Sequence, residues 1–354
     1  MIGIDKIVLN KVDVISIDWE KFNRHPATSV KLATKEHSAR EISKVVFSRI
    51  SSGTHANQFT FEAKMSPDKN TGEWIPTERL CINPATLLYG SNVRNIETSD
   101  ELKTALDIVA WRINDEYGIK IDLSHARISE IEINVNIKLE QPFGEYDKVF
   151  EFVRKSLPAR YKKTTVYDEN GQATGFSVQN TQVLLKFYDK LREAQVIVDG
   201  TANLLRVEYR YRCQDKVKTV LGLDKLEDLL QNFESIKGAF IKNITSDILT
   251  TGPKLLDRRI KQHERDLILA MEEQPKAFID RWLAITEIIF DYELLRQTLL
   301  NVLLKKGRKP RNNRDRIQQL RNAVEKRQEE TALFGQLDLL NNLIEKIKAN
   351  CGII

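Results

Sequence analysis

Residues 128–140 have the sequence ISEIEINVNIKLE, in which apolar and polar side chains alternate along the whole stretch. A period of two residues predicts a β-strand with one face buried in a hydrophobic core. The buried face would carry Ile131, Ile133, Val135, Ile137 and Leu139. The opposite face would carry Glu130, Glu132, Asn134, Asn136 and Lys138. This stretch therefore favours an antiparallel sheet with helices on its apolar face.

Further strands and helices are expected on both sides of this stretch. Residues 57–65, 181–190 and 203–212 also alternate, and Asn170-Gly171 favours a hairpin turn within residues 164–178. Two amphipathic helices are expected, at 98–118 and 145–157. Thr98 or Ser99 would cap the first helix and Gly118 would end it, while Pro158 would end the second.

The apolar spacing changes to the helical period from residue 214 onward. Apolar side chains then recur every three to four residues in four segments, which are separated by Gly252-Pro253, by Gln274-Pro275 and by a basic break at 305–314. The predicted fold class is therefore α+β. An N-terminal domain of residues 1–213 would hold the sheet, and an all-α domain of residues 214–354 would follow it.

Composition and spacing exclude several classes of protein. The chain has 354 residues, of which 41% are hydrophobic, and this length is typical of two or three domains. It lacks GxxxxGK and GxGxxG, so a phosphate-loop motor is not expected. The three cysteines and five histidines are too widely spaced for a local zinc site, so carboxylates would hold most of any metal. We expect a soluble protein of a reducing cytoplasm, without a signal peptide or membrane partner.

The polar faces of three strands combine acidic, basic and tyrosine side chains. Strand 181–190 places Tyr188 between Lys186 and Lys190. Carboxylates from neighbouring strands are suitable ligands for a hard cation such as Mg²⁺ or Mn²⁺. A tyrosine beside that cation could act as a nucleophile, because nearby positive charge favours the phenolate. The alternative is an ordinary solvated sheet face with cross-strand ion pairs and no chemistry.

A basic segment interrupts the helical part of the chain. Residues 301–330 contain ten Lys or Arg and four Asp or Glu, although the whole chain carries a net charge of only +5. Such a local excess of cations is typical of a nucleic-acid contact, and the alternative is a solvated loop between helices. The cations proposed to hold duplex phosphates are Lys305, Lys306, Arg308, Lys309, Arg311, Arg314 and Arg316.

Several short motifs, in order, resemble the gene II/X replication initiators of filamentous phages and related plasmid replication proteins. These motifs are MIGIDKIVLN (1–10), INPATLLYGSNV (82–93), ISEIEINVN (128–136), VLLKFYDK (183–190) and LLRVEYR (204–210), followed by Leu-Gly-Leu at 221–223. The tyrosine strand is also similar to the Tyr-Asp-Lys strand of staphylococcal-type rolling-circle initiators. The resemblance covers roughly residues 1–225. One departure is Glu130-Ile131-Glu132, where the family has Arg-Ile-Asp.

The resemblance implies a nickase that starts rolling-circle replication in the cytoplasm of a bacterial host. Residues 1–213 would form the nickase domain, and residues 214–354 would serve DNA binding or oligomerisation. Tyr188 would attack a DNA phosphodiester, Lys190 would neutralise the phosphate, and Glu132 and Glu208 would hold the divalent metal. Glu130 is a further candidate ligand. The basic residues expected to contact DNA from the sheet are Lys186, Arg206, Arg210 and Arg212.

The expected partners are duplex and single-stranded origin DNA, the host helicase and polymerase, and a second copy of the chain. A second subunit would be useful because the residue four positions after Tyr188 is Arg192 and not a second tyrosine. The alternative function is a non-catalytic DNA-binding or partition protein that grips phosphates through the sheet and the basic helices.

Overall fold

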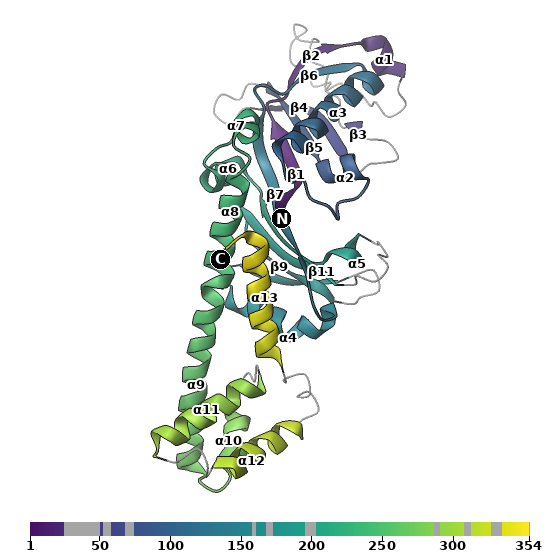
Figure 1. The fold of residues 1–354 in the computed structure, drawn as a ribbon. Coiled ribbons are helices and arrows are strands. Elements are labelled where there is room, and N and C mark those ends of the chain that lie inside the picture. Colours follow the sequence, from purple (N-terminus) through teal and green to yellow (C-terminus); the bar gives the residue numbers. More distant parts are fainter. Residues whose placement is uncertain are drawn as a thin grey trace.

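The alternating stretch forms strand β7 (Arg127–Lys138), which lies in the middle of a large sheet (Figure 1). The computed structural model describes residues 1–24, 50–51, 58–67, 74–157, 161–167, 173–194, 203–286, 291–307, 313–326 and 335–353. In this part of the chain the sheet has nine strands, in the order β3-β4-β5-β1-β7-β11-β10-β9-β8, and all its pairings are antiparallel. The α+β fold class is confirmed.

The other strands of this sheet come from the first 211 residues. They are β1 (Ile2–Asn10), β3 (Ile50–Ser51), β4 (Phe59–Pro67), β5 (Trp74–Ile82), β8 (Lys162–Tyr167), β9 (Ala173–Gln179), β10 (Val183–Asp189) and β11 (Leu204–Tyr211). Strands β2 (Asp13–Ile17) and β6 (Ile119–Asp122) form a separate two-stranded ribbon. The predicted strands 57–65, 128–140, 181–190 and 203–212 are thus all present, whereas the Asn170-Gly171 turn lies outside the described residues.

The helices begin and end close to their sequence signals. Thr98 caps α3 (Ser99–Tyr117) with a capping box, and Gly118 ends it with a φ of 70°. The predicted helix 145–157 corresponds to α4 (Asp147–Ser156). The remaining helices are α1 (Trp19–Arg24), α2 (Pro84–Tyr89), α5 (Lys190–Glu193), α6 (Gln214–Leu221), α7 (Leu226–Gln231), α8 (Ser235–Ile244), α9 (Thr251–Glu273), α10 (Phe278–Ile285), α11 (Tyr292–Lys305), α12 (Arg314–Glu325) and α13 (Gln336–Cys351). None of the described helices is long and apolar enough to cross a membrane.

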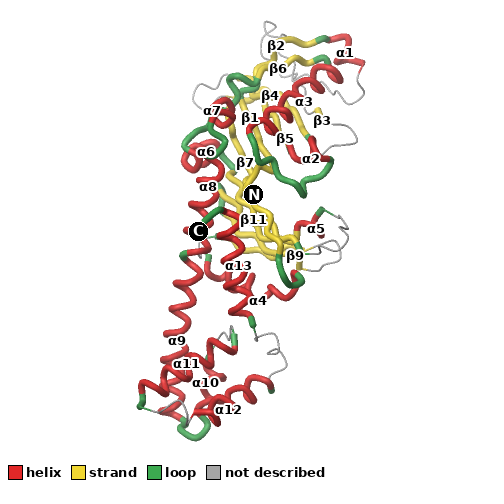
Figure 2. Tube along the Cα trace, viewed as in Figure 1, coloured by secondary structure: helices red, strands yellow, loops and turns green. Residues whose placement is uncertain are grey.

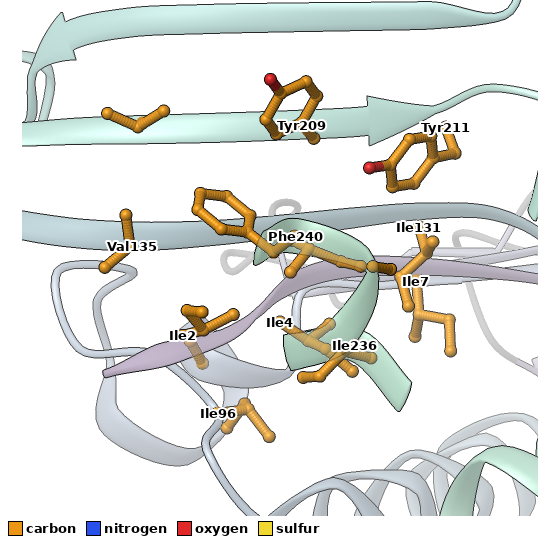
Figure 3. Packing of buried hydrophobic residues seen from close by; sticks show 14 of the residues in the cluster. Ile2, Ile4, Ile7, Ile96, Ile131, Val135, Tyr209, Tyr211, Ile236 and Phe240 are labelled. Carbon is orange, nitrogen blue, oxygen red and sulfur yellow. The ribbon is translucent and has the colours of Figure 1, made fainter. Parts of the chain in front are cut away.

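The apolar face of the sheet holds the main hydrophobic core. Cross-strand register places Ile133 opposite Tyr209, and Tyr209 opposite Leu185. Helix α8 packs on this face, where Phe240 meets the ring of Tyr209 edge-on at 5.5 Å between centroids (Figure 3). Helices α4, α6 and α13 cover more of the same side. Because helices occupy this face, the polar side chains of the same strands gather on the other one.

The hydrophobic clusters divide the chain differently from the predicted boundary at residue 213. One cluster joins the sheet to α3, α4, α6, α7, α8 and the C-terminal helix α13. A second cluster joins the C-terminal half of α9 to α10, α11 and α12. Figures 1 and 2 show α9 leading away from the sheet to this group of helices, here called the helical unit, and α13 returning beside the sheet. Amphipathic spacing predicted these helices but not which core each one joins.

Candidate active site on the polar face of the sheet

Cross-strand register aligns the predicted site residues in rows across β7, β11 and β10. One row contains Asn134, Glu208 and Lys186. The next row contains Asn136, Arg206 and Tyr188 and continues to Gly175 on β9. Residues directly opposite each other in a sheet have Cβ atoms about 5 Å apart, so each row is a set of neighbouring side chains. The expectation that these residues share one face is met.

This polar face is buried, whereas the sequence favoured an open, solvated one. Glu208 is 1% exposed, Asn134 and Arg206 are 0% exposed, and Glu132 and Tyr188 are each 6% exposed. An ordinary solvated sheet face would leave such side chains in water. Buried charges need partners, so the contacts among these side chains determine what the site can do.

Three carboxylates meet at the centre of the face, and one of them was not among the predicted ligands. Asp5, Glu132 and Glu208 each offer an oxygen, and these oxygens lie within 4.8 Å of one another. Asp5 lies on this face by alternation, because Ile2 and Ile4 enter the core and Gly3 and Asp5 point the other way. The register of β1 against β7 shifts between Ile4 and Lys6, so Asp5 is the extra residue of a bulge beside Glu132. We call Asp5, Glu132 and Glu208 the acidic cluster.

The donor set of the acidic cluster fits a divalent cation. Asn134 is fully buried, and neither its side-chain oxygen nor its nitrogen has a hydrogen-bond partner among the described residues. Its register positions are opposite Gly3 on one side and Glu208 on the other, so it borders the cluster. Carboxylate and amide oxygens are the ligands that Mg²⁺ and Mn²⁺ prefer. Burial of an unpartnered amide costs free energy unless a ligand satisfies it.

The titration of the acidic cluster points the same way. Burial, and then the nearby charge of Glu208, raise the pKa of Glu132 to about 7. Burial also raises the pKa of Asp5, even though the adjacent Arg206 opposes that change. For Glu208, burial acts to raise the pKa, but Lys186, Arg206 and the hydrogen bond from Tyr188 together lower it. Carboxyl groups forced together in this way hold a proton until a cation replaces it.

Tyr188 lies directly against the acidic cluster. Its hydroxyl donates a hydrogen bond to Oε2 of Glu208 over 3.0 Å. The ammonium groups of Lys186 and Lys190 lie 5.8 and 5.7 Å from the centre of its ring. The prediction that positive charge favours the phenolate is wrong for this state of the site. Burial, followed by the charge of Glu208, raises the pKa of Tyr188 well above its ordinary value.

The two lysines beside Tyr188 have different environments. Lys186 contacts Oε1 of Glu208 at 2.8 Å, and the carboxylates around it raise its pKa despite burial. Lys190 begins helix α5 and does not continue the strand as predicted; it is fully buried and contacts Glu193 at 2.5 Å. Burial and the neighbouring Arg206 lower the pKa of Lys190.

Arg206 is a positioning residue, and not the DNA contact that was expected from the sequence. It is fully buried, and its Nη1 donates to Oδ2 of Asp5 over 3.2 Å. Its other bonds run to Oδ1 of Asn136 (2.8 Å), the carbonyl of Val93 (3.0 Å) and Oδ1 of Asn95 (3.0 Å). No phosphate can reach a guanidinium enclosed in this way. Arg206 instead ties the loop after α2 to strands β1 and β7.

Glu130 does not belong to the acidic cluster. Arg210 contacts Glu130 at 2.5 Å and Glu132 at 3.2 Å, and Lys6 lies 3.6 Å from Glu130. Arg210 is thus engaged with carboxylates and is only 25% exposed. Arg212 follows the end of β11 at an intermediate exposure. Arg210 and Arg212 were both predicted to contact DNA. Arg210 pairs with carboxylates at the edge of the acidic cluster, and Arg212 lies beyond the end of the strand.

Sequence reasoning also missed Gly175, which faces Tyr188 across the sheet. Its φ is 151°, and a Cβ at this position would lie 2.0 Å from the carbonyl oxygen of Phe187. Only glycine allows β9 to approach β10 this closely. For Asp5, a signal was present in the opening MIGID segment, in which Gly3 and Asp5 alternate with the apolar Ile2 and Ile4.

The predicted basic segment is only partly described. Lys305, Lys306 and Arg314 are exposed, and Lys305 contacts Glu264 of α9 at 2.9 Å. Arg316 lies over the ring of Phe278, 5.1 Å from its centre. Arg308, Lys309 and Arg311 fall outside the described residues. Their contact with duplex DNA remains a prediction.

Comparisons with known proteins give one kind of match. No family model matches the sequence, and no curated protein matches it. Among solved structures, a rolling circle replication initiator protein from Geobacillus stearothermophilus is similar over 61% of this chain and 76% of its own, with 12% identity and a TM-score of 0.30. At that TM-score the likeness carries no residue correspondence, so the site must be interpreted from its own geometry.

Proposed function

We propose that this protein initiates rolling-circle replication by nicking and rejoining origin DNA through Tyr188. The main support for the proposal is that motif segments far apart in the sequence, which resemble the gene II/X initiators, place their side chains next to one another. Asp5, Glu132, Tyr188 and Glu208 come from four strands and meet in one buried group. Arg206 adds the loop at Val93 to the same network. On an ordinary solvated sheet face, polar residues from separate motifs would not be expected to form one buried group.

The reaction is a transesterification at phosphorus. The hydroxyl of Tyr188 gives its proton to Glu208, whose Oε2 already accepts its hydrogen bond. A bond forms between the tyrosine oxygen and the scissile phosphorus, and the bond from phosphorus to the 3′ oxygen breaks. The products are a 5′-phosphotyrosyl protein and a 3′-OH that can prime a polymerase. Because the covalent link preserves the phosphodiester energy, a later 3′-OH can reseal the strand without ATP.

The lysines and carboxylates would support this reaction in different ways. Lys190 is fully buried 5.7 Å from the centre of the Tyr188 ring, so it would help to neutralise the phosphate charge from within the protein, and the departing 3′ oxygen would take its proton from water. Lys186 would stabilise the charge on Glu208 and the incoming phosphate. Asp5, Glu132 and Glu208, with Asn134 beside them, would hold a Mg²⁺ or Mn²⁺ ion. That ion, when bound, polarises a non-bridging phosphate oxygen and stabilises negative charge in the transition state.

The substrate must reach a buried tyrosine, which favours single-stranded or supercoiled origin DNA. Melting a duplex locally costs a few kcal/mol, and an origin under negative supercoiling offsets part of this cost. Origin DNA is therefore the proposed partner, with a host helicase and polymerase acting afterwards. A second subunit would supply the second tyrosine needed to end a replication round.

The test is a Tyr188→Phe variant incubated with origin DNA and Mn²⁺. We expect no protein–DNA adduct that survives SDS, because the nucleophilic oxygen is gone, and nearly unchanged DNA affinity. Tyr209→Phe is the matched control, since Tyr209 lies on the other face of the sheet and also donates over 3.0 Å to a carboxylate, that of Asp247. The control should retain the adduct.

Two other outcomes would redirect the assignment. An adduct formed by Tyr188→Phe would move the nucleophile to another tyrosine, with Tyr167 and Tyr161 tested first. DNA binding by the wild type without any adduct under a panel of metals would favour the non-catalytic DNA-binding or partition protein.

A further inference from the structure

We infer that helix α9 carries a second DNA-binding surface, separate from the basic segment at 305–316. The surface consists of Lys254, Arg258, Lys261 and Arg265, here called the α9 stripe. The residue spacings are four, three and four, which place all four side chains on one face of the helix. At 1.5 Å per residue the stripe is about 16 Å long. The inference rests on the proposed function only in taking DNA as the ligand.

The α9 stripe faces solvent. All four of its residues are exposed, whereas the buried residues of α9 lie on the opposite face and are Gly252, His263, Leu267 and Ala270. Most of these buried residues belong to the half of α9 that packs in the helical unit. The first half of α9 spans the distance between the sheet and that unit, as Figure 1 shows. The stripe is therefore accessible along its length.

The cations of the α9 stripe form no ion pairs in the described part of the chain. The nearest acid is Asp257, which lies three residues after Lys254 and four before Lys261 and pairs with neither among the described residues. Glu264 contacts Lys305 at 2.9 Å, and Asp266 accepts a bond from Gln262 over 2.7 Å. Like charges spaced three and four residues apart destabilise a helix, so four unpaired cations on one face have a cost that a polyanion would offset.

A nucleic-acid backbone matches these features better than a protein surface does. The stripe presents cations without an apolar centre, whereas stable protein interfaces bury aromatic or aliphatic side chains at their core. Duplex DNA carries one negative charge per about 1.7 Å of its axis, so a line of cations along one helix face can contact several phosphates. Duplex DNA is the ligand, because its phosphates are held at fixed positions that a rigid helix face about 16 Å long can match.

The position of the stripe gives it a role distinct from that of the Tyr188 site. The site lies on the sheet, and the stripe lies on the helix that leads from the sheet to the helical unit. Lys305 contacts Glu264, the residue before Arg265, so the end of the stripe borders the predicted basic segment. Duplex held along α9 would extend toward that segment while a melted strand enters the sheet domain.

The experiment measures duplex affinity at several salt concentrations without any cleavage step. The test protein is the full chain with Lys254→Gln, Arg258→Gln, Lys261→Gln and Arg265→Gln. We expect the slope of log K against log salt to flatten by up to about 3.6 units, since each lost phosphate contact removes about 0.9. The control carries Lys103→Gln, Lys120→Gln, Lys218→Gln and Lys225→Gln, which remove four other exposed cations. Its slope should stay within one unit of the wild-type slope.

The outcomes separate this inference from the proposed function. Equal slopes for the wild type and the stripe variant, or a wild type that does not bind duplex at low salt, would overturn the stripe. A slope that flattens equally in both variants would also overturn it, because only net charge would then matter. If the slope flattens in the stripe variant alone while the wild type forms no covalent adduct, the stripe stands and nicking by Tyr188 fails. Circular dichroism of both variants checks that the helices remain folded.

Discussion

The chemistry of the candidate site depends on a small group of charged side chains that are buried next to one another. Glu132 and Glu208 lie on neighbouring strands, and Asp5 joins them from β1. Arg210 and Lys186 balance part of this negative charge at the edge of the group. A cation would replace the remaining proton, which explains how a buried acidic group can be stable both with and without metal.

Glu132→Gln tests this account through the pH dependence of stability. The pKa of Glu132 is raised to about 7 in the folded chain, against about 4.5 when unfolded. The folded state therefore binds the proton more tightly, and this stabilisation is complete below about pH 4.5 and lost as pH rises through about 7. In metal-free buffer, the free energy of unfolding of the wild type should fall relative to Glu132→Gln by up to about 3 kcal/mol over this range.

Mn²⁺ added at pH 8 should restore the stability of the wild type and not that of Glu132→Gln. Urea unfolding at pH 5, 7 and 8 measures both effects, and Glu130→Gln serves as the control because Glu130 lies outside the acidic cluster. Replacing Glu132 or Glu208 by Ala should also reduce metal-dependent cleavage by orders of magnitude. Normal cleavage by Glu132→Ala at low metal would mean that these carboxylates are structural.

At the scale of elements, the strands and their faces could be predicted from the sequence but the irregularities could not. Alternation placed Glu132, Glu208 and Tyr188 on one side of the sheet because a regular strand has a fixed period of two. Asp5 was missed although it follows the alternation of Ile2, Gly3 and Ile4; what alternation does not encode is the register shift after Ile4, which places Lys6 opposite Glu132 on the same face. The burial of the polar face was missed for a similar reason, since it depends on what the chain places over the sheet.

Gly175→Ala is expected to disturb the Tyr188 strand without touching any site side chain. The new Cβ would lie 2.0 Å from the carbonyl oxygen of Phe187 and 2.7 Å from Cα of Tyr188, so β9 and β10 would have to separate. We expect a loss of about 2–3 kcal/mol in the free energy of unfolding, together with reduced adduct formation.

The control for Gly175→Ala is Gly238→Ala in the middle of α8, where a Cβ would have open space. That change should raise stability by about 0.5–1 kcal/mol, because alanine favours helix more than glycine does. Chemical denaturation measures both variants. A Gly175→Ala protein as stable as the wild type would show that β9 does not constrain the position of Tyr188.

At the scale of the whole molecule, the order of helices along the chain does not match the order of the two cores. Helix α13 follows the helical unit in sequence but packs with the sheet and α4. An amphipathic period shows that a helix has an apolar face, but it does not identify the surface that the face will cover. The boundary predicted at residue 213 follows the change of period, whereas the cores depend on long-range packing.

Two alanine substitutions should reveal this arrangement by hydrogen exchange. Ile347→Ala in α13 removes a fully buried side chain from the sheet core, and Leu299→Ala in α11 removes one from the core of the helical unit. Each should cost about 2–5 kcal/mol in its own core, through lost burial and the cavity left behind. With Ile347→Ala, amides of β7 should exchange faster while those of α10 and α12 keep their protection, because the two hydrophobic clusters have no described buried residue in common. With Leu299→Ala the pattern should reverse. Faster exchange in α10 to α12 but not in β7 after Ile347→Ala would place α13 in the helical unit.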